Sequence, residues 1–192
     1  GGAQFAVDGY TVPGQPLTTT TVDTIIRVGD GTTAGAAMTA TIGAAIQGSG
    51  GLAKTDVGTL VLTAANSYTG STTVDGGTLA VRGGAIDSPD AAVTVGRAGN
   101  GSLRVEMGGQ VHSQSGAVGF SPGWQGAAVV TGAGSEWTVG SGGLVIGGSG
   151  TGSLVIEGGG VVQSGFGLAA TQGSGTGSID VSGSGSRLST SG

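Results

Sequence analysis

Apolar residues alternate with Thr, Ser, Asp or Arg in short runs along much of the chain. Leu103 and Val105, and later Leu154 and Ile156, each occupy every second position of such a run. Successive side chains of a β-strand point to opposite faces, so the alternation predicts short strands with one apolar face. The connections, such as residues 147–152, are mostly glycine and serine, which suit tight corners. No stretch follows a helical period, and the pattern predicts an all-β chain.

The runs recur at a fixed spacing in the second half of the chain. Residues 93–113 return as residues 144–164, 51 positions later, with ten of the 21 aligned residues identical. Residues 117–138 return as residues 168–189 at the same offset. Each of these units divides again into two subunits of about 25 residues, and each subunit carries three short runs. Repeats of this length are typical of stacked units without an enclosed globular core.

Each subunit is expected to form one coil of a right-handed parallel β-helix, with three short strands and about 19–26 residues per coil. Leu60 and Leu79 occupy equivalent positions in a shorter coil of the same type. Neighbouring coils would pair at a spacing of ~4.8 Å, so that equivalent apolar residues stack in internal columns. Two such columns are predicted, one from Leu103, Ala128, Leu154 and Ile179 and one from Val111, Trp137, Val162 and Leu188.

Composition narrows the possible partners. The chain has 46 glycines in 192 residues, but its alternating Val, Leu and Ile argue against disorder. The net charge is −5 without any basic cluster, which makes nucleic acid and anionic membranes poor partners. Cysteine is absent, and no apolar run approaches the ~18 residues of a membrane-spanning helix. Neither end shows the polar cap of a complete solenoid, so we expect a segment of a longer exported polypeptide.

A motif in the middle of the chain resembles a known repeat. Residues 50–81 read GGLAKTDVGTLVLTAANSYTGSTTVDGGTLAV. This segment closely resembles the autotransporter-associated β-strand repeat, and it departs from the pattern at Asp56 and Ala64, where glycine is usual. Asn66 and Gly70 are expected at corners, while Tyr68 and Val74 are expected to pack inward. The matching positions are Leu52, Lys54, Gly58, Thr59, Leu60, Leu62, Asn66, Tyr68, Thr69, Gly70, Thr72, Thr73, Val74, Gly77, Thr78, Leu79 and Val81.

The flanking segments resemble other parts of the same class of protein. Residues 93–192 are similar to the repeats of type V secretion passengers, with a GSxW element at Gly134, Ser135 and Trp137. The resemblance implies the passenger domain of a bacterial autotransporter. Such a passenger is displayed at the cell surface and is anchored in the outer membrane by a C-terminal barrel that this chain does not contain. We divide one continuous β-helix into upstream coils (1–49), the β-strand repeat (50–84) and two 51-residue passenger repeats (85–192).

Sequence signals for catalysis, cofactors and metals are weak. The chain has no GxSxG, P-loop, dinucleotide or calcium-nonapeptide motif, and we predict no catalytic, cofactor or metal site. His112 aligns with Gln163 of the next repeat, which indicates a corner or solvent position. Calcium binding by Asp30 or Asp75 is an alternative, but isolated turn aspartates more often bond to the local backbone.

Two glutamates supply an enzymatic alternative. Glu106 and Glu157 are equivalent positions two coils apart, with Thr131 between them. Their expected separation of two strand spacings falls near the ~6.5–9.5 Å between the carboxylates of inverting glycosidases. Both lie on repeat positions, however, and no basic residue is expected to be grouped with them. Stacking, in which alternation keeps like charges apart, is the favoured interpretation.

Trp124 is the candidate surface-contact residue. It lies in a predicted turn, and the equivalent turn of the next repeat has no aromatic residue. We favour a tryptophan folded back on its own coil, and the alternative is an exposed residue that contacts a partner.

Two functions follow from these observations. The first is a non-catalytic stalk and surface for adhesion, with a host surface glycan, a matrix protein or an identical chain as the partner. Self-association fits because uncapped end coils would expose unpaired strand edges. The alternative is a carbohydrate-active β-helix that binds or cleaves a polysaccharide in a groove of carboxylates and aromatics. A spacer without binding of its own is a third possibility.

Overall fold

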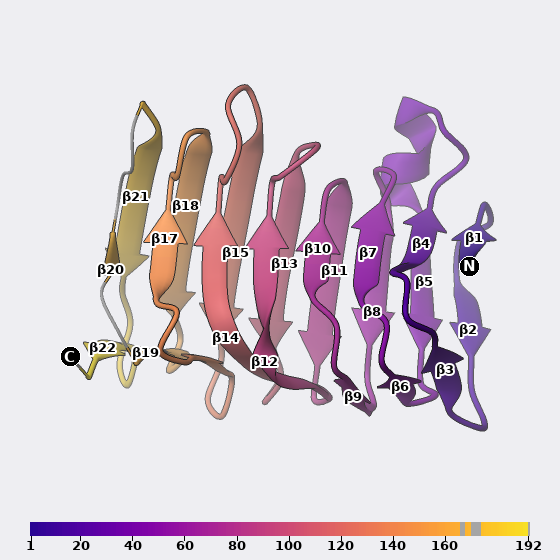
Figure 1. Cartoon of the computed structure of the whole chain (residues 1–192), viewed down its shortest axis with the longest axis horizontal. Coiled ribbons are helices and arrows are strands. Elements are labelled where there is room, and N and C mark those ends of the chain that lie inside the picture. Colours follow the sequence, from indigo (N-terminus) through magenta and orange to yellow (C-terminus); the bar gives the residue numbers. More distant parts are fainter. Residues whose placement is uncertain (166–167, 170–173, 192) are drawn as a thin grey trace.

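The computed structural model of the chain describes residues 1–165, 168–169 and 174–191. The chain winds as a right-handed solenoid, rising along one side, descending along the other and advancing steadily from the N-terminus (Figure 1). Every pair of neighbouring strands in the described residues is parallel. This arrangement confirms the predicted parallel β-helix, with about seven turns.

One face of the solenoid is an eight-stranded sheet to which each coil gives one strand. Its strands, in spatial and chain order, are β2 (Tyr10–Val12), β5 (Thr39–Ile42), β8 (Thr59–Leu62), β11 (Gly77–Arg82), β13 (Gly101–Glu106), β15 (Gln125–Thr131), β18 (Thr151–Glu157) and β21 (Thr176–Val181).

The other two faces belong to one 14-stranded sheet. Two of its strands, β12 (Ala85–Val95) and β14 (Gln110–Val118), pass through the corner and take part in both faces, and their register shifts between Ser88 and Ala92. One of these faces comprises β1 (Gly2–Phe5), β4 (Thr24–Val28), β7 (Leu52–Thr55), β10 (Thr72–Val74), β12 (Ala85–Val95), β14 (Gln110–Val118), β17 (Leu144–Ile146) and β20 (Leu168–Ala169). The other comprises β3 (Leu17–Thr19), β6 (Ile46–Gly48), β9 (Ala65–Tyr68), β12, β14, β16 (Glu136–Val139), β19 (Val161–Ser164) and β22 (Arg187–Thr190).

Both predicted apolar columns are present. Leu103, Ala128, Leu154 and Ile179 pair in register through β13, β15, β18 and β21. The second column likewise pairs in order through β14, β16, β19 and β22. Most of these residues are fully buried, and Ile179 and Leu188 pack against the core at the last coil. The core is therefore a narrow channel of stacked side chains, as the alternation predicted.

Coil length matches the prediction except in the first turn. Leu60 pairs directly with Leu79, and Leu79 with Leu103, so these two coils have the predicted length. Tyr10, however, pairs with Ala40, which makes the first coil longer than predicted. The extra residues include a short 3-10 helix, η1 (Thr33–Ala37), whose first turn is capped by the Thr32 hydroxyl. Apart from this short helix, the described residues form the predicted all-β fold.

Residues 1–21 form a complete coil, because β1, β2 and β3 pair with β4, β5 and β6. Strand pairing continues to β22, and the division at residues 49 and 84 remains a prediction. Ala170, expected in the strand at β20, lies outside the described residues. Within the described part of the chain, no helix has the length and apolar character needed to cross a bilayer.

Candidate functional site

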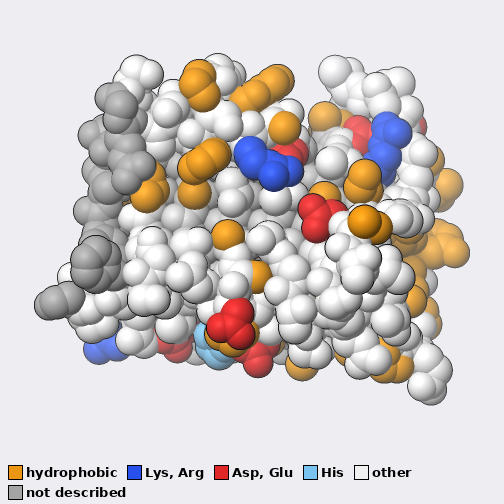
Figure 2. Space-filling model, in the orientation of Figure 1, with side chains coloured by type: hydrophobic (Ala, Val, Ile, Leu, Met, Phe, Trp, Pro, Cys, Tyr) orange, Lys and Arg blue, Asp and Glu red, His pale blue; other side chains and the backbone are white. Residues whose placement is uncertain are grey.

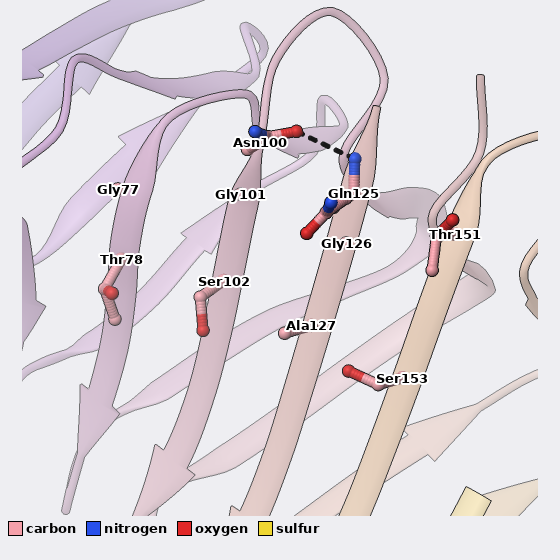
Figure 3. A pocket seen from close by; sticks show the side chains of 10 residues that line it. All are labelled: Gly77, Thr78, Asn100, Gly101, Ser102, Gln125, Gly126, Ala127, Thr151 and Ser153. Carbon is pink, nitrogen blue, oxygen red and sulfur yellow. Dashed lines mark hydrogen bonds between the residues drawn. The ribbon is translucent and has the colours of Figure 1, made fainter. Parts of the chain in front are cut away.

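A shallow groove of about 310 Å³, lined by small uncharged residues and by several hydroxyl and amide side chains, crosses the eight-stranded sheet between β11 and β18 (Figure 3). Four outward positions in register form its floor, namely Thr78, Ser102, Ala127 and Ser153. Neighbouring strands lie ~4.8 Å apart, so the hydroxyls of Thr78 and Ser102 are one strand spacing apart and those of Ser102 and Ser153 are two. Ala127 has only a methyl group, and this small side chain leaves the floor low between the serines.

Two amides and a fourth hydroxyl line the edge of the groove where the strands begin. Asn100 precedes β13, while Gln125 and Thr151 open β15 and β18. The Asn100 side-chain oxygen accepts a hydrogen bond from the Gln125 backbone N–H at 2.9 Å (Figure 3). This contact fixes the Asn100 side chain across the gap between two coils, and the Asn100 amino group has no partner among the described residues and can donate to a ligand.

The groove presents hydrogen-bonding groups that the protein itself does not use. Within the described residues, the side-chain oxygens of Thr78, Ser102, Thr151 and Ser153 have no intramolecular partner. The Gln125 side-chain amide is also free in this part of the chain. The strands hold these groups in fixed positions, so a ligand would meet a rigid array of donors and acceptors.

An aromatic loop, residues 119–124, lies beside the groove. The exposed fractions of its Phe120 and Trp124 are 49% and 41%. Backbone hydrogen bonds anchor the loop on both sides, from Phe120 N–H to the Gly96 carbonyl and from Thr151 N–H to the Trp124 carbonyl. Trp124 directly precedes Gln125 of the groove edge. The structure thus leaves the indole available for contact, and its role in binding a partner remains a prediction.

Charge is low around the groove. None of the ten residues that line it is charged. The arginines closest to it in sequence both have carboxylate partners, since Arg97 lies 3.7 Å from Asp75 and Arg104 lies 2.9 Å from Glu106. Figure 2 shows a different face, where basic side chains form small separate groups among mostly uncharged surface. The groove is therefore suited to an uncharged ligand.

Glu106 is an ion-pair centre, which the sequence analysis did not predict. Its carboxylate accepts hydrogen bonds from Arg82 of the preceding coil and from Arg104 of its own strand. Burial alone raises the pKa of Glu106, but the hydrogen bonds and charges of the two arginines outweigh it and lower the pKa. The expectation that no basic residue accompanies this glutamate was wrong, because the coil spacing brings Arg82 alongside it.

The paired-carboxylate alternative loses support from this geometry. Glu106, Thr131 and Glu157 occupy one outward row in register, as the repeat predicted. A glycosidase general acid needs a raised pKa, whereas the two arginines hold the pKa of Glu106 below its ordinary value. The structure therefore gives Glu106 the environment of a structural ion pair.

His112 lies on the outer surface, as its alignment with Gln163 indicated. Its Nδ1 atom is 3.1 Å from a carboxylate oxygen of Asp87 on the neighbouring coil, and both side chains are exposed. The pair is a contact between coils that position-by-position sequence comparison does not reveal.

The turn aspartates bond to backbone groups. Asp30 accepts hydrogen bonds from the N–H and hydroxyl of Thr32, which lower the pKa of Asp30. Asp75 accepts from the N–H groups of Arg97 and Ala98 in the next coil. Asp30 thus bonds within its own turn, as expected, whereas the backbone partners of Asp75 lie in the next coil and not in its own turn. Among residues 1–165 and 174–191, no three His, Cys, Asp or Glu side chains cluster as metal ligands would.

Buried polar side chains stabilise the short coils by hydrogen bonds to backbone groups, and the sequence analysis did not predict this role. The Lys54 ammonium donates to the carbonyls of Thr55, Asp56 and Gly76, and burial lowers the pKa of Lys54 to about 8. Asn66 was expected at a corner but is buried within β9, where its side chain bonds to the backbone of its own coil and of both neighbouring coils. The only earlier signal was that both residues match the repeat motif.

Tyr68 and Val74 are fully buried, as predicted. The Tyr68 hydroxyl lies 2.7 Å from that of Thr72, and burial raises the pKa of Tyr68. Gly70 approaches the backbone of Gly50 and Gly51 so closely that a Cβ would lie 2.3 Å from the Gly51 nitrogen. This close approach explains the glycine at the corner.

Comparisons with known proteins bear on the middle segment first. Residues 52–81 match the family model described as "Passenger-associated-transport-repeat". Part of the chain is also 58% identical, over 80 residues, to the "Adhesin BmaC autotransporter" of Brucella suis biovar 1 (strain 1330). That alignment covers 42% of this chain and only 2% of the adhesin. No solved structure matches the chain.

Proposed function

We propose that the chain provides a non-catalytic adhesion surface on a rigid stalk. The proposal starts from its place as a segment of an autotransporter passenger, which is displayed at the bacterial cell surface. The observation that carries the proposal is the 58% identity to a segment of a protein named as an adhesin. The solenoid adds a physical reason, because its exposed outer faces offer many contact positions along one axis. The groove is the best-defined of these positions.

The stalk role follows from the way the coils stack. Each coil adds one strand spacing to the length, so a longer array of such coils would hold its surface far from the membrane. We propose that the whole polypeptide includes a C-terminal outer-membrane barrel, which serves as the anchor of the stalk.

The partner is a surface glycan, a matrix protein or an identical chain on a neighbouring cell.

Surface display on a non-adhesive bacterium tests the proposal. Cells that carry residues 1–192 on a barrel carrier are expected to bind epithelial cells or matrix-coated plates, or to clump, more than cells with the carrier alone. Equal adhesion and clumping in both strains, at equal surface levels, would reduce the segment to a spacer.

The non-catalytic part is tested separately. Incubation of the purified chain with a panel of polysaccharides should release no reducing ends. Cleavage that disappears in Glu106→Gln or Glu157→Gln would contradict this part and revive the carbohydrate-cleaving alternative.

A further inference from the structure

We propose that the groove of Figure 3 binds a neutral, extended oligosaccharide that lies along the solenoid axis and stacks one sugar ring on Trp124. The inference deepens the proposed adhesion function, because it names the site and the chemical class of one partner. It depends on three features of the described residues. These are the polar groups without an intramolecular partner, the exposed indole, and the lack of charged side chains in the groove.

The polar groups match the chemistry of a sugar. A sugar ring presents hydroxyls that both donate and accept, and the groove supplies hydroxyls of the same double capacity from Thr78, Ser102 and Ser153. The amides of Asn100 and Gln125 add donors and acceptors at the groove edge. Thr78 and Ser102 are one strand spacing of ~4.8 Å apart and Ser102 and Ser153 are two, and one such spacing is comparable to the length of one sugar ring.

The indole supplies the apolar contact that hydroxyls cannot. Trp124 keeps 41% of its surface exposed although large apolar side chains are usually buried. Its loop is tied to both neighbouring loops by backbone hydrogen bonds, so the main chain that carries the ring is held in place before a ligand arrives. Aromatic rings with one apolar face and one polar tip are favoured where proteins bind partners.

Charge distinguishes a neutral glycan from an acidic one. The groove has no cationic side chain, and Arg97 and Arg104 beside it are already paired with Asp75 and Glu106. The whole chain carries a net charge of −5, which repels sialylated, sulfated or uronic acid polymers.

The test is a titration of the purified 192-residue chain, followed by NMR, with a β-1,4-linked glucose hexamer as the neutral probe and a hyaluronan hexamer as the acidic probe. We expect the neutral probe to bind weakly and reversibly, with shifts centred on residues 100–102, 124–127 and 151–153. The acidic probe should bind at least tenfold more weakly.

Two variants and a matched control locate the site. Ala127→Tyr fills the floor without entering the core, because Ala127 points outward in a strand that tolerates aromatic residues, and it should abolish binding of the glucose hexamer. Trp124→Ala should weaken binding roughly tenfold or more. Thr41→Tyr makes the same outward change on β5 of the same sheet, away from the groove, and should leave binding unchanged.

The proposal is overturned if the glucose hexamer does not bind, if the acidic probe binds as tightly, or if Ala127→Tyr and Thr41→Tyr behave alike. Its failure is separable from that of the adhesion function. Cells that display the Ala127→Tyr chain and still adhere as well as the unmodified chain would retain adhesion and reject the groove as its site.

Discussion

The coils of residues 52–82 and those of residues 101–165 solve the same structural problem in different ways. Both must satisfy the backbone groups at three tight corners while keeping an apolar channel inside. The first region has the shorter coils, as the direct pairing of Leu60 with Leu79 shows. The second region has the longer coils, in which Leu103 pairs with Ala128 and Ala128 with Leu154.

The short coils use long polar side chains that turn inward. Lys54 and Asn66 are almost completely buried, and each makes three hydrogen bonds to backbone groups. With few residues left for loops, the corner carbonyls and N–H groups have to find partners on side chains.

The long coils use glycine turns and a small hydroxyl instead. The Ser135 hydroxyl accepts a hydrogen bond from Gly108 N–H, and Ser186 accepts one from Gly159 N–H at the equivalent position of the next repeat. The additional residues form loops whose backbone groups bond to one another. Coil length therefore decides whether a corner needs a buried polar side chain.

Removing the largest core residue of the long coils should have the greatest effect. Trp137 is fully buried, and its indole N–H donates to Ser113. Trp137→Ala should lower the free energy of unfolding by about 4 kcal/mol, because it leaves a large cavity. Urea unfolding followed by circular dichroism measures this, with the outward Thr138→Ala as the control. Equal urea midpoints for the two variants would show that the column containing Trp137 does not contribute to the stability of the core.

Removing the buried Asn66 side chain tests how the short coils are stabilised. Asn66→Ala should cost about 3 kcal/mol, because it leaves three buried backbone groups without their hydrogen bonds. The adjacent Ser67→Ala changes an exposed outward side chain of the same strand and should cost little. Hydrogen exchange should show the loss of protection first at Ile46 and around β9. A loss spread evenly over short and long coils would remove the distinction between them.

The sequence alone predicted the apolar core columns but not the buried polar side chains that bond to the backbone of the short coils. The alternation and the 51-residue repeat determine which residues point inward, because strand geometry leaves few other solutions. The Arg82–Glu106 contact depends on the exact alignment of two successive coils, which an unequal coil length shifts. Gly116 illustrates the same limit, since a Cβ there would lie 2.7 Å from the Trp137 ring. Neither the Arg82–Glu106 contact nor the groove can be recognised from a local pattern in the sequence.

Titration of Lys54 gives the short coils a pH dependence in the alkaline range. Burial lowers the pKa of Lys54 from 10.5 to about 8 in the folded chain, with Asp56 partly opposing the shift. Below pH 8 the folded state carries the cost of a buried charge. Above it the unfolded chain binds the proton that the folded chain has released, so stability rises.

The rise between pH 8 and pH 10 should be roughly 2 kcal/mol. It ends there because burial raises the pKa of Tyr68 above its ordinary value, and the unfolded chain then gains by ionising this tyrosine. Urea midpoints measured across this range should show the rise in the unmodified chain and not in Lys54→Met. A similar rise in the variant would assign it to another group.

The smallest expected change in stability comes from a substitution at Met107. Met107 has a φ of 56° and is 75% exposed, and the residues at its position in the neighbouring coils, Gly83 and Gly132, also have positive φ. Met107→Gly should stabilise the chain by about 1 kcal/mol, because glycine adopts this conformation without strain. Met107→Ala keeps the strain and should bring no gain. Thermal melts of the two variants that coincide would contradict this explanation.

The alignment of successive coils is what places the core columns, the ion pairs and the groove, and cross-linking measures it directly. The chain has no cysteine, so Ser102→Cys combined with Ala127→Cys introduces the only pair. Their positions are direct partners on adjacent strands, within the ~4.4–6.8 Å Cα separation that a disulfide needs. We expect this pair to cross-link completely under mild oxidation and Ser102→Cys with Val129→Cys to cross-link poorly. The reverse result would contradict the register of the coils.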